Sequence, residues 1–354
     1  MTAVPADALV TPLNRKYLGS KRLLRARIAD RIVDAAGVPE RFLDGFCGTG
    51  ALTLEMLARG AGRITAVDNL LSNCVILRGA CAAPSDPAVR ARLAALIDRL
   101  NRLEPKDGYL TESYAGAYFT RDNCRRMDAV REEIERLHVE GEVVAAERDW
   151  LLGCFLLAAD RVANTLGQYD AYLKHLEAAS TVGGRHVRDG RVTDPFVLRP
   201  LAPVARGAAV TVIEGDLAAG CELPAVDVAY LDPPYNGRQY CDNYHVLENL
   251  ARWNRPELHG RTRKFDRSGL RSPFSTRRGA APALEGLLHR VRARHLFVSY
   301  GSEGILRREQ IVEMLSACGA VTVHEESYPV FGNGAGVSRR REVTELLFHA
   351  ARRG

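Results

Sequence analysis

An acidic residue, two prolines and a tyrosine directly follow an apolar run at residues 226–231. They are Asp232, Pro233, Pro234 and Tyr235. Because proline cannot donate a hydrogen bond to a sheet ladder, the strand predicted over the apolar run must end at Asp232. Open α/β sheets bind their ligands at the carboxyl ends of such buried strands. The feature therefore favours an α/β fold with a site at this turn.

The groups at this turn suit an exocyclic amine on a planar base. Such an amine is a poor nucleophile because its lone pair is delocalised into the ring. The Asp232 carboxylate and the Pro233 carbonyl are placed to accept one hydrogen each, which positions the lone pair and stabilises the charge that develops on nitrogen. Tyr235 would stack on the base, as in pockets for flipped bases. The alternative is a proline-rich turn that only ends a strand.

The size and charge of the chain set broad limits. Its 354 residues suffice for one large core and a second lobe, and an apolar content of 46% is ordinary for a globular protein. The net charge of +6 favours an anionic partner, although the excess is small for a dedicated nucleic-acid coat protein.

The cysteines and the apolar segments indicate a cellular compartment. The eight cysteines form no CxxC pair, so neither a metal site nor a disulfide framework is predicted. Residues 1–13 lack a signal-peptide pattern, and the longest apolar stretch, 150–159, is too short to span a bilayer. We expect a soluble, cytoplasmic protein that does not enter a membrane.

The segment Tyr-Leu-Gly-Ser-Lys at residues 17–21 precedes an amphipathic pattern. Ser20 is placed to cap a helix that follows it. Lys21 in the first turn is unfavourable for the helix dipole unless it faces an anion. The alternative is a solvated lysine.

A glycine loop follows the first predicted strand at residues 41–43. It comprises Asp44, Phe46, Gly48 and Gly50 within Asp-Gly-Phe-Cys-Gly-Thr-Gly. Two glycines let the backbone turn tightly and approach a ligand closely. Because Thr53 stands where a dinucleotide fingerprint has its third glycine, an uncharged nucleoside is favoured over a pyrophosphate.

Asp68 ends the second predicted strand, eighteen residues after Gly50. An acid at this point is placed to accept both hydroxyls of a ribose. A simple turn is the alternative, since Asp-Asn is a common loop pair.

Taken together, these motifs resemble the Dam-like, alpha-group family of S-adenosylmethionine-dependent DNA adenine-N6 methyltransferases. The resemblance implies a seven-stranded class I, Rossmann-like methyltransferase sheet with a helical target-recognition insertion. It implies that the glycine loop and Lys21 hold the methionine end of the cofactor and that Asp68 holds its ribose. An acid before the catalytic strand, either Asp216 or Glu214, would reach the adenine of the cofactor. The cofactor-binding residues assigned on this basis are Tyr17, Lys21, Asp44, Phe46, Gly48, Gly50, Asp68 and Asp216.

A long insertion separates Asp68 from Asp216. It contains 147 residues, and apolar residues at helical spacing predict helices from Pro87, from about Asn123 and over 150–162. We predict a catalytic domain at 1–79 and 208–354 and a helical target-recognition domain at 80–207. A purely structural or dimerising lobe is the alternative.

Basic and polar residues follow the Asp-Pro-Pro-Tyr tetrad at residues 232–235. Arg238, Gln239 and Tyr240 resemble a stretch that follows it in some of these enzymes, and we place them at the pocket rim. Residues 255–278 hold eight arginines and lysines against two acids, including Arg261, Arg263 and Lys264, and such a loop can follow phosphates. A solvated surface loop is the alternative.

The sequence thus predicts an enzyme that transfers a methyl group to the N6 amine of a flipped adenine in double-stranded DNA, with catalytic residues at 232–235 and no metal. An RNA adenine methyltransferase, a cytosine-N4 enzyme, a protein glutamine methyltransferase and a non-catalytic DNA-binding regulator remain alternatives. The recognition sequence, the oligomeric state, a restriction-modification role and a cognate endonuclease are not inferable from the sequence.

Overall fold

The chain divides into two compact units in the computed structural model. The structure describes residues 9–15, 17–84, 86–173, 181–182, 185–186, 190–204, 209–331 and 340–352. The first unit comprises Met1–Gly19, Leu71–Val204 and Cys241–Arg267, and the second comprises Ser20–Leu70, Ala205–Tyr240 and Ser268–Gly354. These boundaries differ from the predicted domains at 1–19, 71–79 and 241–267, which all join the helical unit. Residues 71–79 and 241–267 join it because the helices α3 (Leu71–Cys81) and α9 (His245–Arg252) pack against its central helix α7 (Ala145–Val162).

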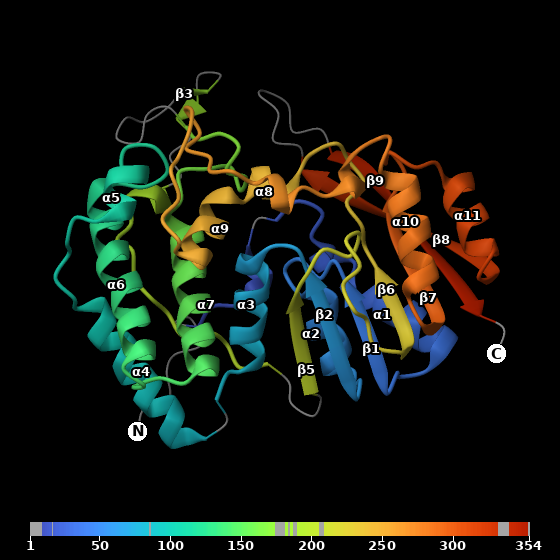
Figure 1. Cartoon of the computed structure of the whole chain (residues 1–354), viewed down its shortest axis with the longest axis horizontal. Coiled ribbons are helices and arrows are strands. Elements are labelled where there is room, and N and C mark those ends of the chain that lie inside the picture. Colours follow the sequence, from blue (N-terminus) through green and yellow to red (C-terminus); the bar gives the residue numbers. More distant parts are fainter. Residues whose placement is uncertain are drawn as a thin grey trace. The chain divides into compact units, whose positions relative to one another are not determined.

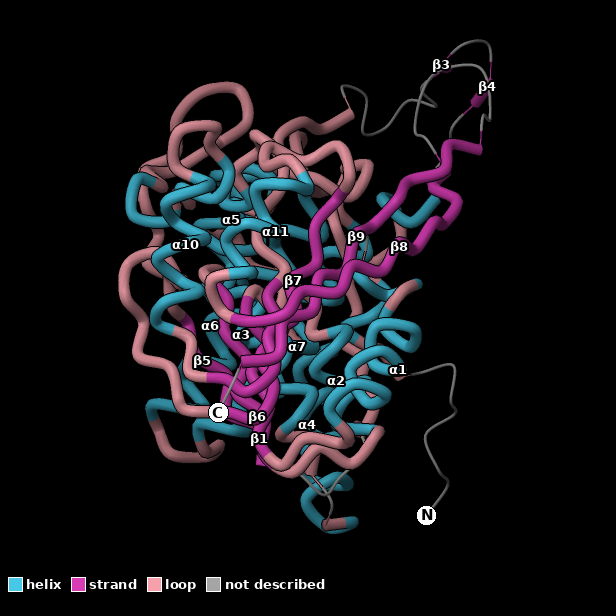
Figure 2. The backbone as a smooth tube through the Cα atoms, turned by 90° about the vertical axis from the view of Figure 1, so that its right-hand side faces the viewer, coloured by secondary structure: helices cyan, strands magenta, loops and turns pink. Residues whose placement is uncertain are grey.

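A seven-stranded sheet forms the core of the second unit. Its strands are β1 (Arg41–Gly45), β2 (Arg63–Asp68), β5 (Ala209–Glu214), β6 (Val226–Leu231), β7 (Ala293–Gly301), β8 (Gly319–Phe331) and β9 (Arg340–Arg352). Their order in the sheet is β5-β2-β1-β6-β7-β9-β8. The first five of these are parallel, while β9 is antiparallel to both of its neighbours. The predicted seven-stranded α/β sheet is confirmed, and Figure 2 shows its antiparallel strands β8 and β9 running side by side.

Helices cover both faces of this sheet. In Figure 2, α1 (Arg25–Ala36) and α2 (Ala51–Ala58) lie on one side of the strands, and α10 (Ala280–Arg290) and α11 (Arg308–Ser316) lie on the other. Strands covered on both faces are buried throughout, which explains the near-continuous apolar runs of β6 and β7.

The strand order reverses between β1 and β6. The chain passes from β1 outward to β2 and β5 and then returns to β6 on the other side of β1. In open α/β sheets the carboxyl ends of the strands at such a switch point form the ligand site. Here those ends carry Gly45, Asp68 and Leu231, which are followed by the glycine loop and the tetrad.

Helices make up most of the first unit. Besides α3 and α9 they are α4 (Pro87–Asn101), α5 (Tyr109–Tyr114), α6 (Arg121–Val139) and α7 (Ala145–Val162). Figure 1 shows α4, α6 and α7 in one layer of helices. The three predicted helices are confirmed, and Asp86 caps α4 by accepting a hydrogen bond from the Ala88 amide at 2.7 Å. Because α7 is apolar on nearly all sides, it is buried between α3, α6 and α9.

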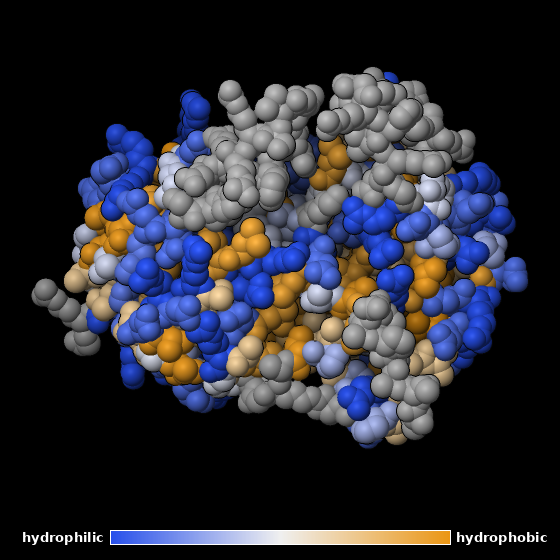
Figure 3. Space-filling view, turned by 180° about the vertical axis from the view of Figure 1, so that it is seen from behind, coloured by the Kyte–Doolittle hydropathy of each residue, from blue (hydrophilic) through white to orange (hydrophobic). Residues whose placement is uncertain are grey.

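The surface carries both hydrophilic and hydrophobic residues. The face shown in Figure 3 is largely hydrophilic, with hydrophobic residues between the charged ones. Within the described ranges, the large apolar side chains that are exposed are Leu23, Val38, Val139, Val144, Leu166 and Val197. None of the described helices has the length and apolar character needed to cross a bilayer.

Candidate active site

The Asp-Pro-Pro-Tyr tetrad at residues 232–235 begins where β6 ends, as the prolines predict. The Asp232 amide donates a hydrogen bond to the Gly45 carbonyl at 3.3 Å, which ties the tetrad to the end of β1. The Asp232 side chain is 15% exposed, and Pro233 is buried. The carboxylate therefore lies at the switch point, and solvent reaches only a small part of it.

Lys21 reaches this carboxylate from a separate element. Ser20 caps the short 3-10 helix η3 (Lys21–Leu23) rather than a long helix, and α1 begins only at Arg25. This break points the Lys21 side chain inward, where it is 6% exposed. Its Nζ donates to Asp232 Oδ1 at 2.7 Å and lies 3.2 Å from Glu345 Oε1. The solvated-lysine alternative is therefore wrong.

The three charged groups shift one another's proton affinity. Burial by itself would lower the pKa of Lys21, but the carboxylates of Asp232 and Glu345 hold that pKa well above its ordinary range. Burial raises the pKa of Asp232 to about 7, with Glu345 adding to the rise and Lys21 opposing it. Both pKa values are raised, but for different reasons: the lysine faces two carboxylates, whereas Asp232 is buried and shares the Lys21 ammonium with a second carboxylate. Asp232 is thus ionised mainly above neutral pH.

The ring of Tyr235 is held beside the carboxyl end of β7. It meets Tyr300 edge-on, with ring centroids 5.8 Å apart, and the Lys21 ammonium lies 5.3 Å from its centre. A Cβ on Gly301 would lie 3.1 Å from Tyr235 Cε2, so glycine is what leaves room for the ring. Half-buried and fixed in this way, Tyr235 offers an aromatic surface suited to stacking.

The glycine loop turns through left-handed backbone conformations. The φ angles are 66° at Phe46, 53° at Gly48 and 73° at Gly50. For a bulky residue such as Phe46 this conformation is strained, and strain of this kind concentrates at functional sites. The Cys47 amide donates to the Val67 carbonyl at 2.9 Å, which holds the loop against the end of β2.

Asp44 is buried beneath this loop and is tied to α2. Its Oδ2 accepts hydrogen bonds from the Thr53 amide at 3.0 Å and from Thr53 Oγ1 at 2.6 Å. Thr53 therefore binds Asp44 through its side-chain hydroxyl, a hydrogen bond that a glycine at position 53 could not make. Burial raises the pKa of Asp44 to about 7, although the Thr53 hydroxyl partly opposes the shift.

Asp68 joins the end of β2 to the glycine loop. Its Oδ2 accepts from the Gly48 amide at 2.8 Å, and its Oδ1 accepts from the Leu70 amide at 2.9 Å. The bond from Leu70 is the local contact expected if Asp68 were only a turn residue. The bond from Gly48 is not local, so a simple turn does not explain it. The Asp68 carboxylate thus holds the glycine loop in place, and it lies at the carboxyl end of β2, where open α/β sheets bind ligands.

Asp216, the acid that follows β5, makes a hydrogen bond within its own turn. Asp216 Oδ1 accepts a hydrogen bond from the Ala218 amide at 2.8 Å, the geometry of a turn acid, and its rival Glu214 is exposed at the end of β5. A cofactor contact by either residue stays a prediction.

The predicted DNA contacts fall in both units. In the second unit, Arg238 is exposed, and Tyr240 is half-buried at the start of α8 (Tyr240–Asn243). Gln239 is buried, because its amide exchanges two hydrogen bonds with the main chain of Ser272, at 3.0 and 2.8 Å. Gln239 thus holds the following loop in place.

In the first unit, the basic segment is partly tied down. Arg261 and Arg263 are exposed, and the Lys264 ammonium lies 3.8 Å from Asp242. The main chains of His259 and Lys264 exchange two hydrogen bonds, so the arginines project from a tight turn.

Tyr17 also belongs to the first unit. Its ring stacks on Tyr244 with centroids 4.5 Å apart, and its hydroxyl accepts a hydrogen bond from Asn73 Nδ2 at 2.9 Å. Its assignment to the cofactor stays a prediction.

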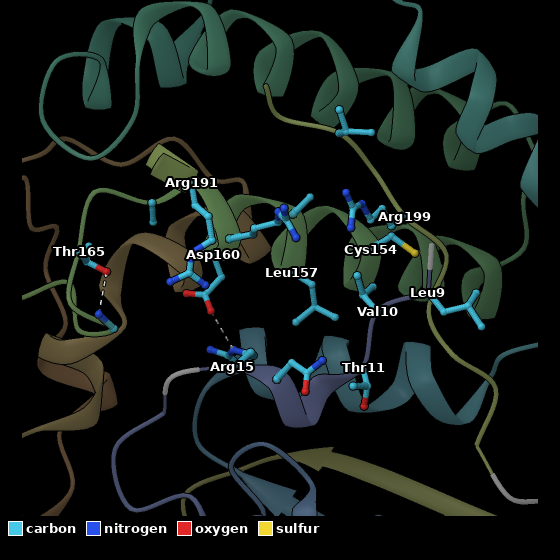
Figure 4. Close-up of a pocket in the computed structure, with 16 residues that line it drawn as sticks. Leu9, Val10, Thr11, Arg15, Cys154, Leu157, Asp160, Thr165, Arg191 and Arg199 are labelled. Atoms are coloured by element: carbon cyan, nitrogen blue, oxygen red, sulfur yellow. Dashed lines mark hydrogen bonds and ion pairs between the residues drawn. The ribbon is translucent and has the colours of Figure 1, made fainter. Parts of the chain in front are cut away.

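A cavity of about 360 Å³ lies within the first unit, between the N-terminal segment and α7. Figure 4 shows Arg15, Arg191 and Arg199 among its lining residues, and Asp160, whose Oδ2 is 3.9 Å from Arg15 Nε. Sequence analysis missed this cavity because the arginines are widely separated in the chain.

Sequence analysis also missed Glu345. The sequence analysis assigns it no role, yet its side chain is 2% exposed and lies against Lys21. The available signal was a single glutamate inside the apolar run that forms β9.

The chain is similar to proteins of known function. Residues 17–314 match the family described as D12 class N6 adenine-specific DNA methyltransferase. The modification methylase StsI of Streptococcus sanguinis is 29% identical over 96% of this chain and 52% of its own length. The type II methyltransferase M.CviAII of Paramecium bursaria Chlorella virus 1 is 31% identical over 87% of this chain and 89% of its own. M.NlaIII of Neisseria lactamica is 28% identical over 89% and 92%.

The relatives differ in length. This chain spans about half of StsI, and 47% of M.FokI of Planomicrobium okeanokoites, which is 28% identical to it. It spans nearly all of M.NlaIII and M.CviAII.

Proposed function

Because this chain belongs to the D12 class of N6 adenine-specific DNA methyltransferases, we propose that it methylates the N6 amine of an adenine in double-stranded DNA with S-adenosylmethionine as the methyl donor. Membership of the adenine-N6 family agrees with the resemblance seen in the sequence, while the alpha-group subclass stays a prediction. A role as a modification enzyme paired with an endonuclease is part of the proposal, because several relatives are named modification or type II methylases.

The donor set at the strand ends suits this cofactor. Asp68 ends β2, Asp232 follows β6 and Asp44 is the last residue but one of β1, so the carboxyl edge of three adjacent strands is rich in carboxyl groups. Such an edge would repel a pyrophosphate, but it accommodates a ribose together with a cationic ammonium and sulfonium. When bound, S-adenosylmethionine supplies an electrophilic methyl group. Asp68 would accept the ribose hydroxyls, and the strained loop at Phe46 would contact the remainder of the cofactor.

One contact carries the proposal for the chemistry: Lys21 binds Oδ1 of Asp232 at 2.7 Å. Within the described residues, Asp232 Oδ2 has no hydrogen-bond partner, so it can accept one hydrogen of the adenine amine. The Pro233 carbonyl would accept the other, and Tyr235 would stack on the base.

When bound, S-adenosylmethionine would supply its methyl group to the N6 lone pair and leave as S-adenosylhomocysteine, and N6 would then lose one proton to solvent. The ionised Asp232 stabilises the positive charge on nitrogen during this step. Since Asp232 is ionised mainly above its pKa of about 7, we expect methyl transfer to fall as the pH decreases below neutrality.

DNA binding is assigned mainly to the first unit in this proposal, while Arg238 and Tyr240 of the second unit lie at the pocket rim. Its helical insertion supplies the target-recognition surface, and the exposed Arg261 and Arg263 supply phosphate contacts. Flipping the base costs a few kcal/mol, which stacking and phosphate contacts offset.

The direct test is transfer of labelled methyl groups from S-adenosylmethionine into unmethylated genomic DNA, with equal masses of cellular RNA in parallel. Label recovered from DNA as N6-methyladenine supports the proposal, whereas N4-methylcytosine replaces the base. Label in RNA alone would keep the pocket chemistry but reject DNA as the substrate. No label in either, with the cofactor bound, would leave a non-catalytic DNA-binding protein.

A further inference from the structure

Glu345 is a buried carboxylate on β9 that the proposed chemistry does not use. Its side chain is 2% exposed, and it pairs across the sheet with Gly301 at the end of β7. A buried carboxylate without partners is strongly unfavourable, so its contacts indicate its role.

Two groups converge on one oxygen of this carboxylate. Ser299 Oγ donates to Glu345 Oε1 at 2.8 Å, and Lys21 Nζ lies 3.2 Å from the same atom. The other oxygen, Oε2, is buried and has no hydrogen-bond partner within the described residues. A carboxylate that served only the packing of β9 would not need this cation, whose nearer partner is Asp232.

Building on the methyl transfer proposed above, we infer that Glu345 is a positioning residue for that reaction: it shares the Lys21 ammonium with Asp232 and thereby sets the orientation and the charge state of the Asp232 carboxylate. Ser299 fixes Glu345, Glu345 fixes the ammonium, and the ammonium fixes Oδ1 of Asp232. Because the Lys21 ammonium faces two carboxylates, its attraction to Asp232 is weakened by its attraction to Glu345. The catalytic carboxylate is then less strongly bound to lysine and more available to the adenine amine.

The charge balance around Asp232 gives the sign of the expected effect. The titratable groups that act on it or lie beside it come from each surrounding element: Lys21 on η3, Asp44 on β1, Tyr230 on β6, Tyr235 in the tetrad and Glu345 on β9. Burial and Glu345 raise the pKa of Asp232, and Lys21 lowers it. Removing the Glu345 charge while Lys21 remains must therefore lower the pKa of Asp232.

The test compares Glu345→Gln with the wild-type chain. The substitution keeps the shape and an oxygen acceptor for Ser299 but removes the charge. We expect the pKa of Asp232 to fall by about one unit, the lower end of the effect of a nearby charge. Carbon-13 NMR of aspartate carboxyl groups would follow this titration, with Asp232→Asn identifying the signal. The acid limb of the pH profile of kcat/KM should move to lower pH by the same amount, while the affinity for S-adenosylmethionine at pH 8 stays near that of the wild type.

Glu325→Gln is the matched control. Glu325 lies on the neighbouring strand β8, is paired with the exposed Arg308 and is opposite Leu346, so its side chain points to the other face of the sheet. It removes the same charge without touching Lys21. An unchanged titration of Asp232 in Glu345→Gln, or a shift of equal size in Glu325→Gln, would overturn the inference.

A second variant covers the case in which Glu345→Gln does not fold. Ser299→Ala keeps all charges and removes the hydrogen bond that fixes Glu345. It should lower kcat with little change in the titration of Asp232, and an unaltered kcat would contradict the inference. The NMR titration needs no turnover. If wild-type protein methylates no nucleic acid, the proposed function fails while the charge coupling of Glu345 to Asp232 is still measured.

Discussion

The carboxyl ends of the strands in the second unit and the turn at residues 259–264 in the first unit both concentrate charge, but in opposite ways. At the strand ends, charges are buried and meet specific partners, as Lys21 meets Asp232 and Glu345. In the turn, Arg261 and Arg263 are exposed to solvent. Buried charges act at short range in a low dielectric, whereas exposed charges act over about 10 Å and are screened by salt. The first arrangement suits chemistry on one group, and the second suits attraction to a polyanion.

The largest effect is expected from Asp232→Ala. Loss of the carboxylate that accepts the adenine amine should lower kcat by at least roughly 100-fold while the affinity for S-adenosylmethionine stays close to that of the wild type. Calorimetry for the cofactor and a single-turnover methylation assay separate the two quantities. The control is Asp227→Ala, at the other end of β6, where the carboxylate binds Arg41. Lost cofactor affinity in Asp232→Ala would refute this division of labour.

Asp68→Asn should affect cofactor binding instead. Replacing the charged acceptor costs about 1.5–3 kcal/mol, so the dissociation constant for S-adenosylmethionine should rise by roughly 10- to 100-fold. At saturating cofactor, kcat should be nearly restored. Glu40→Gln, just before the other end of β1, is the control, since Glu40 is exposed and lies 4.0 Å from Arg63. Equal cofactor affinity in Asp68→Asn and wild type would remove Asp68 from the proposed ribose site.

Burial of Asp44 predicts a pH dependence of stability. Its pKa rises from 3.8 to about 7 in the folded protein, so the folded state binds the proton more tightly than the unfolded chain. This stabilisation is complete below the unfolded pKa and is lost as the pH rises through 7. The free energy of unfolding of the cofactor-free protein should therefore fall by about 2 kcal/mol between pH 5.5 and 7.5 from this group alone.

Asp44→Asn keeps an acceptor for Thr53 and should flatten that dependence. Asp232 shifts in the same direction, so part of the slope should remain. Denaturant unfolding at several pH values measures it. The same slope in wild type and variant would show that Asp44 is ionised in the folded protein.

The smallest effect concerns the turn. Arg261→Ala combined with Arg263→Ala should weaken DNA binding by about tenfold at low salt and reduce the salt slope by about two. Because phosphates carry no sequence information, the loss should be similar for all DNA sequences. Arg294→Ala, an exposed arginine near the amino end of β7 in the second unit, is the control. A loss confined to the preferred site would instead make these arginines readers of bases.

The sequence by itself determined the fold class and much of the ligand edge. Prolines at 233 and 234 end β6 wherever it lies in the sheet, and the glycines at 48 and 50 permit the left-handed turn that the loop adopts. These outcomes are local, because they depend on backbone restrictions of the residues themselves. The apolar periodicity of residues 87–162 likewise predicts its helices without knowledge of their neighbours.

Only the tertiary structure decided which charges meet. Lys21 and Asp232 are 211 positions apart, and Glu345 comes from the last strand of the sheet, yet all three converge. A surface lysine and a buried lysine look alike in a sequence, because the difference lies in a short 3-10 helix that turns the side chain inward and in partners supplied by β6 and β9. The roles of Thr53 beneath Asp44 and of Gln239 on Ser272 were hidden for the same reason. Charge pairing depends on distance in space, and strand order sets that distance.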